Sequence, residues 1–160
     1  MQTSTALKTA ILGFGNPVRS DDAIGVYVAN ELQTHLQHRD DVMVFDMGTS
    51  AFEILFKLKG HQRLIIVDGV INSGEADGTL FCLPASEINA QIQEDPLVFL
   101  HGMKWDQALS YAKKLMGDEF SKTEILVYLV AISEIKINIE LSDVVKAAGD
   151  KLIETILNDL

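Results

Sequence analysis

Runs of apolar residues alternate along the chain with stretches in which apolar and polar positions are mixed. The continuous runs are short and rich in β-branched residues, which predicts strands at 9–13, 42–46, 63–68 and 124–132. Spacings of three or four residues between apolar positions predict helices at 22–38, 51–59, 86–93, 105–116 and 143–160. Strands that alternate with helices in this way are typical of a parallel sheet covered by helices.

One further strand, at 79–83, is expected to run against the others. It begins ten residues after Gly69, and the connection is rich in turn-forming residues. A parallel crossover needs about a dozen residues or more, so this strand is placed antiparallel to the third strand, at an edge. The pattern predicts an α/β fold: a three-layer α/β/α sandwich around a mostly parallel five-stranded sheet with one antiparallel strand.

Composition narrows the classes of protein. The 160 residues are expected to form a single domain, 1–160, large enough to fold without a disulfide or a structural metal. The net charge of −10 argues against nucleic acid as a partner, because cations supply most of that affinity. Cys82 is the one cysteine and no run approaches the roughly 20 apolar residues of a membrane span, so a cytoplasmic protein with no membrane insertion is expected.

The candidate chemistry gathers at the carboxyl ends of the parallel strands, where open α/β sheets bind ligands. Asp21 and Asp22 open the first helix, where acids favour the helix dipole, and Ser20 or Asp21 is expected to cap it. Asp68 ends an apolar strand and has no such duty to a long helix. The structural alternative for Asp68 is a hydrogen bond that stabilises the turn at Gly69.

His101 is the histidine with candidate chemistry, because it lies in a loop flanked by apolar residues. A histidine in such a place is more often packed and hydrogen-bonded than a metal ligand. Two aspartates and an imidazole nevertheless suit a first-row divalent ion such as nickel or zinc. Cys82, inside an apolar strand, is predicted to be an inert buried thiol, and Trp105 is predicted to be a core or interface residue.

The loop after the first strand also suggests a dinucleotide site, since Gly13 and Gly15 follow a strand and Asp46 ends the next one. Val18 stands where the third glycine of that motif would be. Two carboxylates at the start of the helix would repel a pyrophosphate. Nucleotide binding is therefore not favoured.

The run from Gly13 to Gly25 resembles the opening signature of the hydrogenase maturation endopeptidases: Gly-x-Gly-Asn, a short apolar stretch, two acids, then a small residue and glycine. The resemblance continues, in order along the chain, at 46–49, 64–68, 101–102 and 141–142. Ala23, Val18 and the Ser133-Glu134 pair depart from the usual residues of the family, but none of them is a proposed ligand. These departures leave the particular hydrogenase partner open.

The resemblance implies an aspartic-type endopeptidase that removes a C-terminal extension from the precursor of the nickel-iron hydrogenase large subunit after nickel insertion. It implies that Asp22, Asp68 and His101 contact the metal and carry catalysis. It also implies that the precursor supplies the nickel, with no permanently bound cofactor. Helical projection puts Asp21 nearer the apolar stripe than Asp22, and geometry from the sequence does not choose between them.

Two other readings stay open: a conventional metal-dependent hydrolase with its own ion at the same three residues, and a non-catalytic chaperone that senses the nickel centre. The group that activates water also stays open, because either an acid acts as general base or the metal polarises the scissile carbonyl. Asp46 and the turn at 48–49 are expected to shape the peptide groove.

Overall fold

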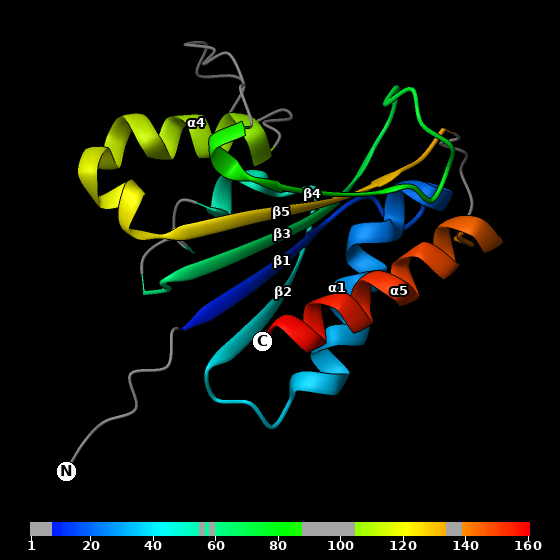
Figure 1. Cartoon of the computed structure of the whole chain (residues 1–160), viewed down its shortest axis with the longest axis horizontal. Helices are drawn as coiled ribbons and strands as arrows, with labels where there is room; N and C mark the ends of the chain where they lie inside the picture. Colours follow the sequence, from blue (N-terminus) through cyan, green and yellow to red (C-terminus); the bar gives the residue numbers. More distant parts are fainter. Residues whose placement is uncertain (1–7, 55–56, 58–59, 88–104, 134–138) are drawn as a thin grey trace.

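The computed structural model describes residues 8–54, 57, 60–87, 105–133 and 139–160. A five-stranded sheet forms its centre (Figure 1). The strands are β1 (Thr9–Phe14), β2 (Val42–Gly48), β3 (Arg63–Val70), β4 (Leu80–Pro84) and β5 (Glu124–Ala131). The α-helices with defined bounds are α1 (Ile24–Leu36), α4 (Trp105–Met116) and α5 (Asp143–Asp159), and the 3-10 turns are η1 (Ser20–Ala23), η2 (Ala51–Glu53), η3 (Ala85–Glu87) and η4 (Gly117–Lys122).

The strand order is β2-β1-β3-β5-β4, with β4 antiparallel to β5 and the other pairs parallel. The mostly parallel sheet and the antiparallel edge strand predicted from the sequence are confirmed. The partner of β4 is β5, however, and β5 separates it from β3. The crossover through α4 places β5 beside β3, which leaves the outer edge to β4.

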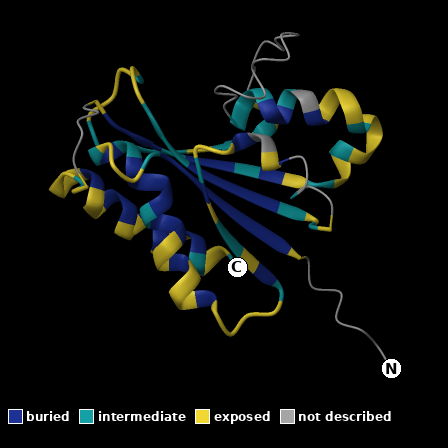
Figure 2. Cartoon of the chain, turned by 180° about the vertical axis from the view of Figure 1, so that it is seen from behind, coloured by how far each residue is buried: buried dark blue, intermediate teal, exposed yellow. Residues whose placement is uncertain are grey.

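Alternating side chains along the strands build a core on each face of the sheet. Ile11, Ile65 and Val67 pack with α1 and α5 on one face. Leu12 and Ile66 pack with α4 and the η2 region on the other. Figure 2 shows the buried strands between helices whose outer surfaces are exposed. The predicted three-layer α/β/α sandwich is therefore confirmed.

Several predicted elements differ at their ends. The helix expected at 22–38 begins as η1 and becomes α-helical at Ile24. The N-cap residues of these two elements, Arg19 and Ala23, make no side-chain capping hydrogen bond. Of the helices expected at 51–59 and 86–93, the structure describes η2 with a few helical positions after it, and η3; the rest lies outside the described residues. The helix predicted at 105–116 is confirmed as α4.

The prediction that Cys82 is buried was wrong, because the residue is exposed. It lies on the edge strand β4, opposite Tyr128 of β5. A strand with a neighbour on one side only is covered less completely than a central strand.

Helix α1 approaches the sheet so closely that two positions admit only glycine. A Cβ atom at Gly25 would lie 2.1 Å from the carbonyl oxygen of Phe14 and 2.5 Å from that of Val67. A Cβ at Gly13 would lie 2.2 Å from the carbonyl oxygen of Gly25. The first turn of α1 therefore rests on the backbone at the ends of β1 and β3.

We expect Gly25→Ala to lower the free energy of unfolding by about 3 kcal/mol, because the obstructing atoms are backbone atoms that cannot move without shifting a strand. Gly149→Ala in α5 is the matched control. Its Cβ would meet the terminal methyl group of Ile24 at 2.7 Å, and a methyl group can turn away. Urea unfolding of both variants measures the difference, and equal stabilities would contradict the close approach.

Candidate functional site

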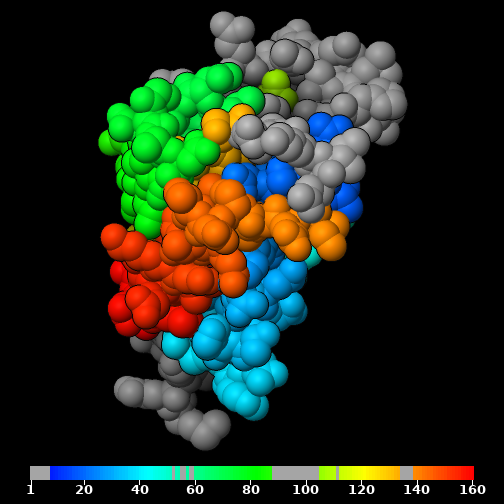
Figure 3. Space-filling view, turned by 90° about the vertical axis from the view of Figure 1, so that its right-hand side faces the viewer, coloured from blue at the N-terminus to red at the C-terminus, as the bar shows by residue number. Residues whose placement is uncertain are grey.

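The carboxyl ends of β1, β2 and β3 open onto one edge of the molecule. Figure 3 views this edge, where the loop after β1, the segment between β3 and β4, and the start of α5 lie together. η1 contacts β3 at the same place. Gly13 of β1 pairs with Asp46 of β2 and with Val67 of β3. Asp68 is therefore the first residue of β3 beyond its pairing with β1.

Hydrogen bonds to β2 and to a side chain of the loop itself hold the loop between β1 and η1. The Gly15 N–H donates to the Gly48 carbonyl at 2.8 Å, and the Val18 N–H donates to the Asn16 side chain at 3.1 Å. Gly15 has φ +149°, and a Cβ there would lie 2.0 Å from the Asp22 carbonyl oxygen. Ser20 takes the left-handed φ of 44°, which is uncommon for a residue other than glycine. This loop therefore fixes the orientation of η1 and of its two acids, Asp21 and Asp22.

Asp21 is a structural residue. It is 4% exposed, and its carboxylate accepts hydrogen bonds from the Ser142 N–H at 2.7 Å and the Ser142 hydroxyl at 2.9 Å. Ser142 is also the N-cap of α5, where its hydroxyl oxygen accepts from the Val145 N–H. Asp21 therefore fastens η1 to α5, and both its oxygens are engaged in doing so.

Asp22 is half-buried and lies at the edge itself. Its Oδ2 accepts a hydrogen bond from the Asn16 N–H at 3.2 Å. Within the described part of the chain, Asp22 Oδ1 accepts no hydrogen bond. Of the two adjacent acids, Asp22 is the one with an oxygen to offer to a ligand.

Asp68 is half-buried at the end of β3, and two N–H groups orient its carboxylate. The Gly69 N–H donates to Oδ1 at 2.8 Å, as the structural alternative expected, but Gly69 belongs to β3, which continues to Val70, and not to a turn. The indole N–H of Trp105 donates to Oδ2, also at 2.8 Å. The sequence predicts Trp105 to be a core or interface residue, and its ring does pack against the core beneath α4. The link to Asp68 was missed.

The other predicted positions divide into described and undescribed ones. His101 lies outside the described residues. Asp46 is exposed, and its Oδ1 accepts from the Gly48 N–H at 3.0 Å, which shapes the turn after β2. Among the described residues there is no group of three or more His, Cys, Asp or Glu side chains that could hold a metal ion.

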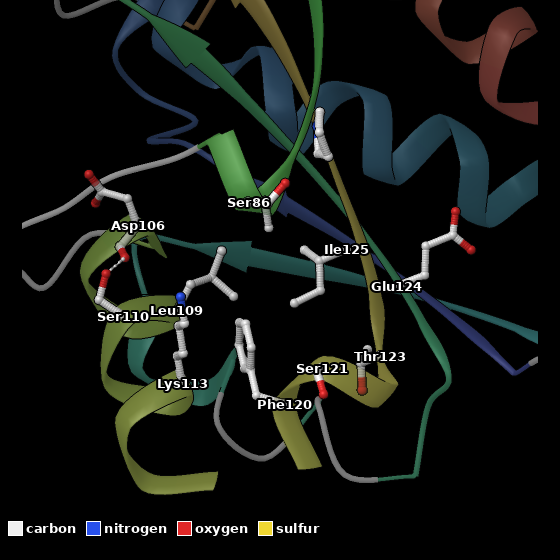
Figure 4. A pocket seen from close by; sticks show the side chains of 12 residues that line it. Ser86, Asp106, Leu109, Ser110, Lys113, Phe120, Ser121, Thr123, Glu124 and Ile125 are labelled. Carbon is white, nitrogen blue, oxygen red and sulfur yellow. Dashed lines mark hydrogen bonds between the residues drawn. The ribbon is translucent and has the colours of Figure 1, made fainter. Parts of the chain in front are cut away.

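A separate pocket of about 410 Å³ lies at the opposite end of β5 (Figure 4). Leu109 of α4, Phe120 of η4 and Ile125 of β5 point into it, with Lys113 at its side. Neither Asp22 nor Asp68 lines this pocket. The candidate chemistry and this pocket are therefore different places on the molecule.

A sequence model of the HycI hydrogenase maturation proteases matches residues 26–159. The chain belongs to the hydrogenase maturation protease family. This peptidase is 29% identical over 151 residues to the hydrogenase 2 maturation protease of Escherichia coli, covering 94% of this chain and 89% of that protein. It is also 29% identical over 140 residues to protein FrxA of Pyrococcus furiosus, covering 86% and 94%.

Solved structures of maturation proteases share the fold of this family member. The E. coli endopeptidase HybD superimposes with a TM-score of 0.75 at 23% identity, over 96% of this chain and 92% of that one. HybD from Thermococcus kodakarensis gives 0.71 at 23% identity, over 95% and 98%. Among the described residues, no helix has the length and apolar character needed to cross a membrane.

The different surroundings of the two adjacent acids predict different effects on stability. We expect Asp21→Ala to lower the free energy of unfolding by about 3 kcal/mol, because hydrogen bonds to a buried charged group are lost at Ser142. Asp22→Ala should cost less than about 1 kcal/mol, since its one hydrogen bond is long and half-buried. Urea unfolding checks this, and a similar loss in both variants would show that Asp21 is not the anchor.

Proposed function

We propose that this maturation protease removes the C-terminal extension of a nickel-iron hydrogenase large-subunit precursor after nickel insertion. Asp22, Asp68 and His101 contact the nickel centre of that precursor and carry the reaction. The observation that supports the proposal is that the carboxylates at the sheet edge have different environments. Both carboxylate oxygens of Asp21 accept hydrogen bonds from Ser142. Asp22 and Asp68 are half-buried and lie where parallel α/β sheets bind ligands.

The packing of α1 on the sheet supports the pairing of Asp22 with Asp68. Gly25, three residues after Asp22, rests on the carbonyl of Val67. Val67 directly precedes Asp68. This contact brings η1 over the end of β3. The two carboxylates therefore share one edge although 46 residues of sequence separate them.

Carboxylate oxygens and an imidazole nitrogen form a donor set that suits a borderline cation such as nickel. In this proposal the ion belongs to the substrate, and the peptidase has no permanently bound cofactor. Asp22 and Asp68 recognise that the precursor is loaded, so cleavage waits for metal insertion.

His101 enters the proposal through the family resemblance at 101–102. In the sequence it precedes Trp105, whose indole N–H donates to Asp68, by four residues.

The surface around the acids suits a protein substrate. Four exposed apolar residues, which we term the apolar rim, lie on the segments that meet at this edge: Val18, Ile71, Ile139 and Val144. The turn before β4 lies against the start of α5, since a Cβ at Gly78 would lie 2.7 Å from a methyl group of Val144. Exposed apolar side chains that gather on one surface are typical of a protein–protein contact. The occupant that we propose is the large-subunit precursor.

Asp68→Asn and Asp22→Asn should each slow processing of a nickel-loaded precursor by at least about 100-fold, because each removes a charge from the proposed site. Intact mass of the precursor, with and without nickel, measures the loss of its C-terminal peptide. Asp40→Asn is the matched control, since Asp40 is exposed before β2 at the other end of the sheet. Thermal unfolding of each variant shows that the protein is folded.

The alternatives give different results in the same assay. An unchanged mass of the nickel-loaded precursor would contradict the proposal, and binding without cleavage would favour a chaperone. Stoichiometric zinc in the purified protein, with cleavage of unrelated peptides, would favour a conventional metal hydrolase. Cleavage of the loaded precursor alone supports the proposal.

The double variant Val18→Ser with Ile71→Ser should raise KM for the precursor about tenfold and leave kcat unchanged, because it removes contact area outside the chemistry. Leu115→Ser is the control, as Leu115 is 72% exposed at the far end of α4. Initial rates over a range of precursor concentrations give both constants. Equal KM values for the double variant and the control would exclude the rim from docking.

A further inference from the structure

Trp105 contacts both the core and the candidate site. It is the first residue of α4, it is half-buried, and its ring packs against the apolar cluster between α4 and the sheet. Its N–H reaches Asp68, 37 residues away in sequence, at 2.8 Å. The ring is held by the core while its polar atom points at the candidate site.

We propose that Trp105 is a positioning residue that fixes the carboxylate of Asp68 for the reaction, an inference that rests on the proposed function. The Gly69 N–H holds Oδ1, and the indole N–H holds Oδ2. Donors on both oxygens fix the rotation of the carboxylate about its bond to Cβ. Neither of these two donors carries a charge.

The choice of a tryptophan fits this role better than packing alone. A phenylalanine would fill much of the same space, but it has no donor for Asp68. Donors that orient a metal-contacting group through a hydrogen bond commonly change activity ten- to a hundredfold when they are removed. Because the ring packs against the core, the position of its N–H is fixed by the fold, and this N–H in turn orients Asp68.

The composition of the chain allows a sharp test. Trp105 is its one tryptophan, so growth of a tryptophan auxotroph on an analogue alters this position alone. Benzothienylalanine has the shape of tryptophan with sulfur in place of the N–H, whereas fluorotryptophan keeps the N–H and serves as the matched control. The isostere should lower kcat for the nickel-loaded precursor about tenfold or more, with KM and the thermal midpoint unchanged. Fluorotryptophan should retain activity.

A second measurement tests the hydrogen bond without any assay of activity. Isotope-labelled protein gives one indole N–H signal by NMR, and Asp68→Ala should shift it, whereas Asp40→Ala should not. An unmoved signal would overturn the hydrogen bond. A shifted signal with full kcat in the isostere would overturn the positioning role. Failure of the wild-type protein to cleave the loaded precursor would instead overturn the proposed function, and the NMR result would still decide the bond.

Discussion

Backbone contact between the first turn of α1 and the ends of β1 and β3 is the constraint on which the edge of this molecule depends. Gly13 and Gly25 meet with no room for a Cβ atom, and Gly25 also rests on the Val67 carbonyl. Side chains between the helix and the sheet would lift η1 away from β3. Their absence lets a helix-borne acid and a strand-borne acid share one surface. The two glycines thus shape the proposed site without contributing a functional group to it.

The same turn separates two neighbouring carboxylates into different environments. In a 3-10 turn successive side chains are about 120° apart, so Asp21 and Asp22 point in different directions. Asp21 enters the interior, where an unpaired carboxylate would be costly, and Ser142 supplies two donors. Asp22 remains at the surface. One part of the protein's acidity therefore holds the structure together, and another part is left for ligands.

Local patterns in the sequence predicted most of the fold, whereas long-range contacts decided the site. The apolar run of β3 and the short connection before β4 were sufficient for the layered sheet and its antiparallel edge. Cys82 was wrongly expected to be buried, because an apolar strand looks the same at an edge as in the centre. Asp21 was expected as a possible cap of the first helix, but it is bonded instead to a residue 121 positions away in the sequence. Likewise, nothing near Trp105 in the sequence indicates that its N–H meets Asp68.

The bond between Asp21 and Ser142 also has a consequence for the timing of assembly in the cell. Synthesis proceeds from the N-terminus at roughly 5–20 residues per second, so η1 leaves the ribosome well before α5 exists. Until then the Asp21 carboxylate lacks its Ser142 donors, and η1 is not fastened. The proposed site is therefore completed late, because a nascent chain that ends before Ser142 lacks both the donors to Asp21 and the helix that covers one face of the sheet. Formation of the proposed site is in this way coupled to completion of the peptidase's own chain.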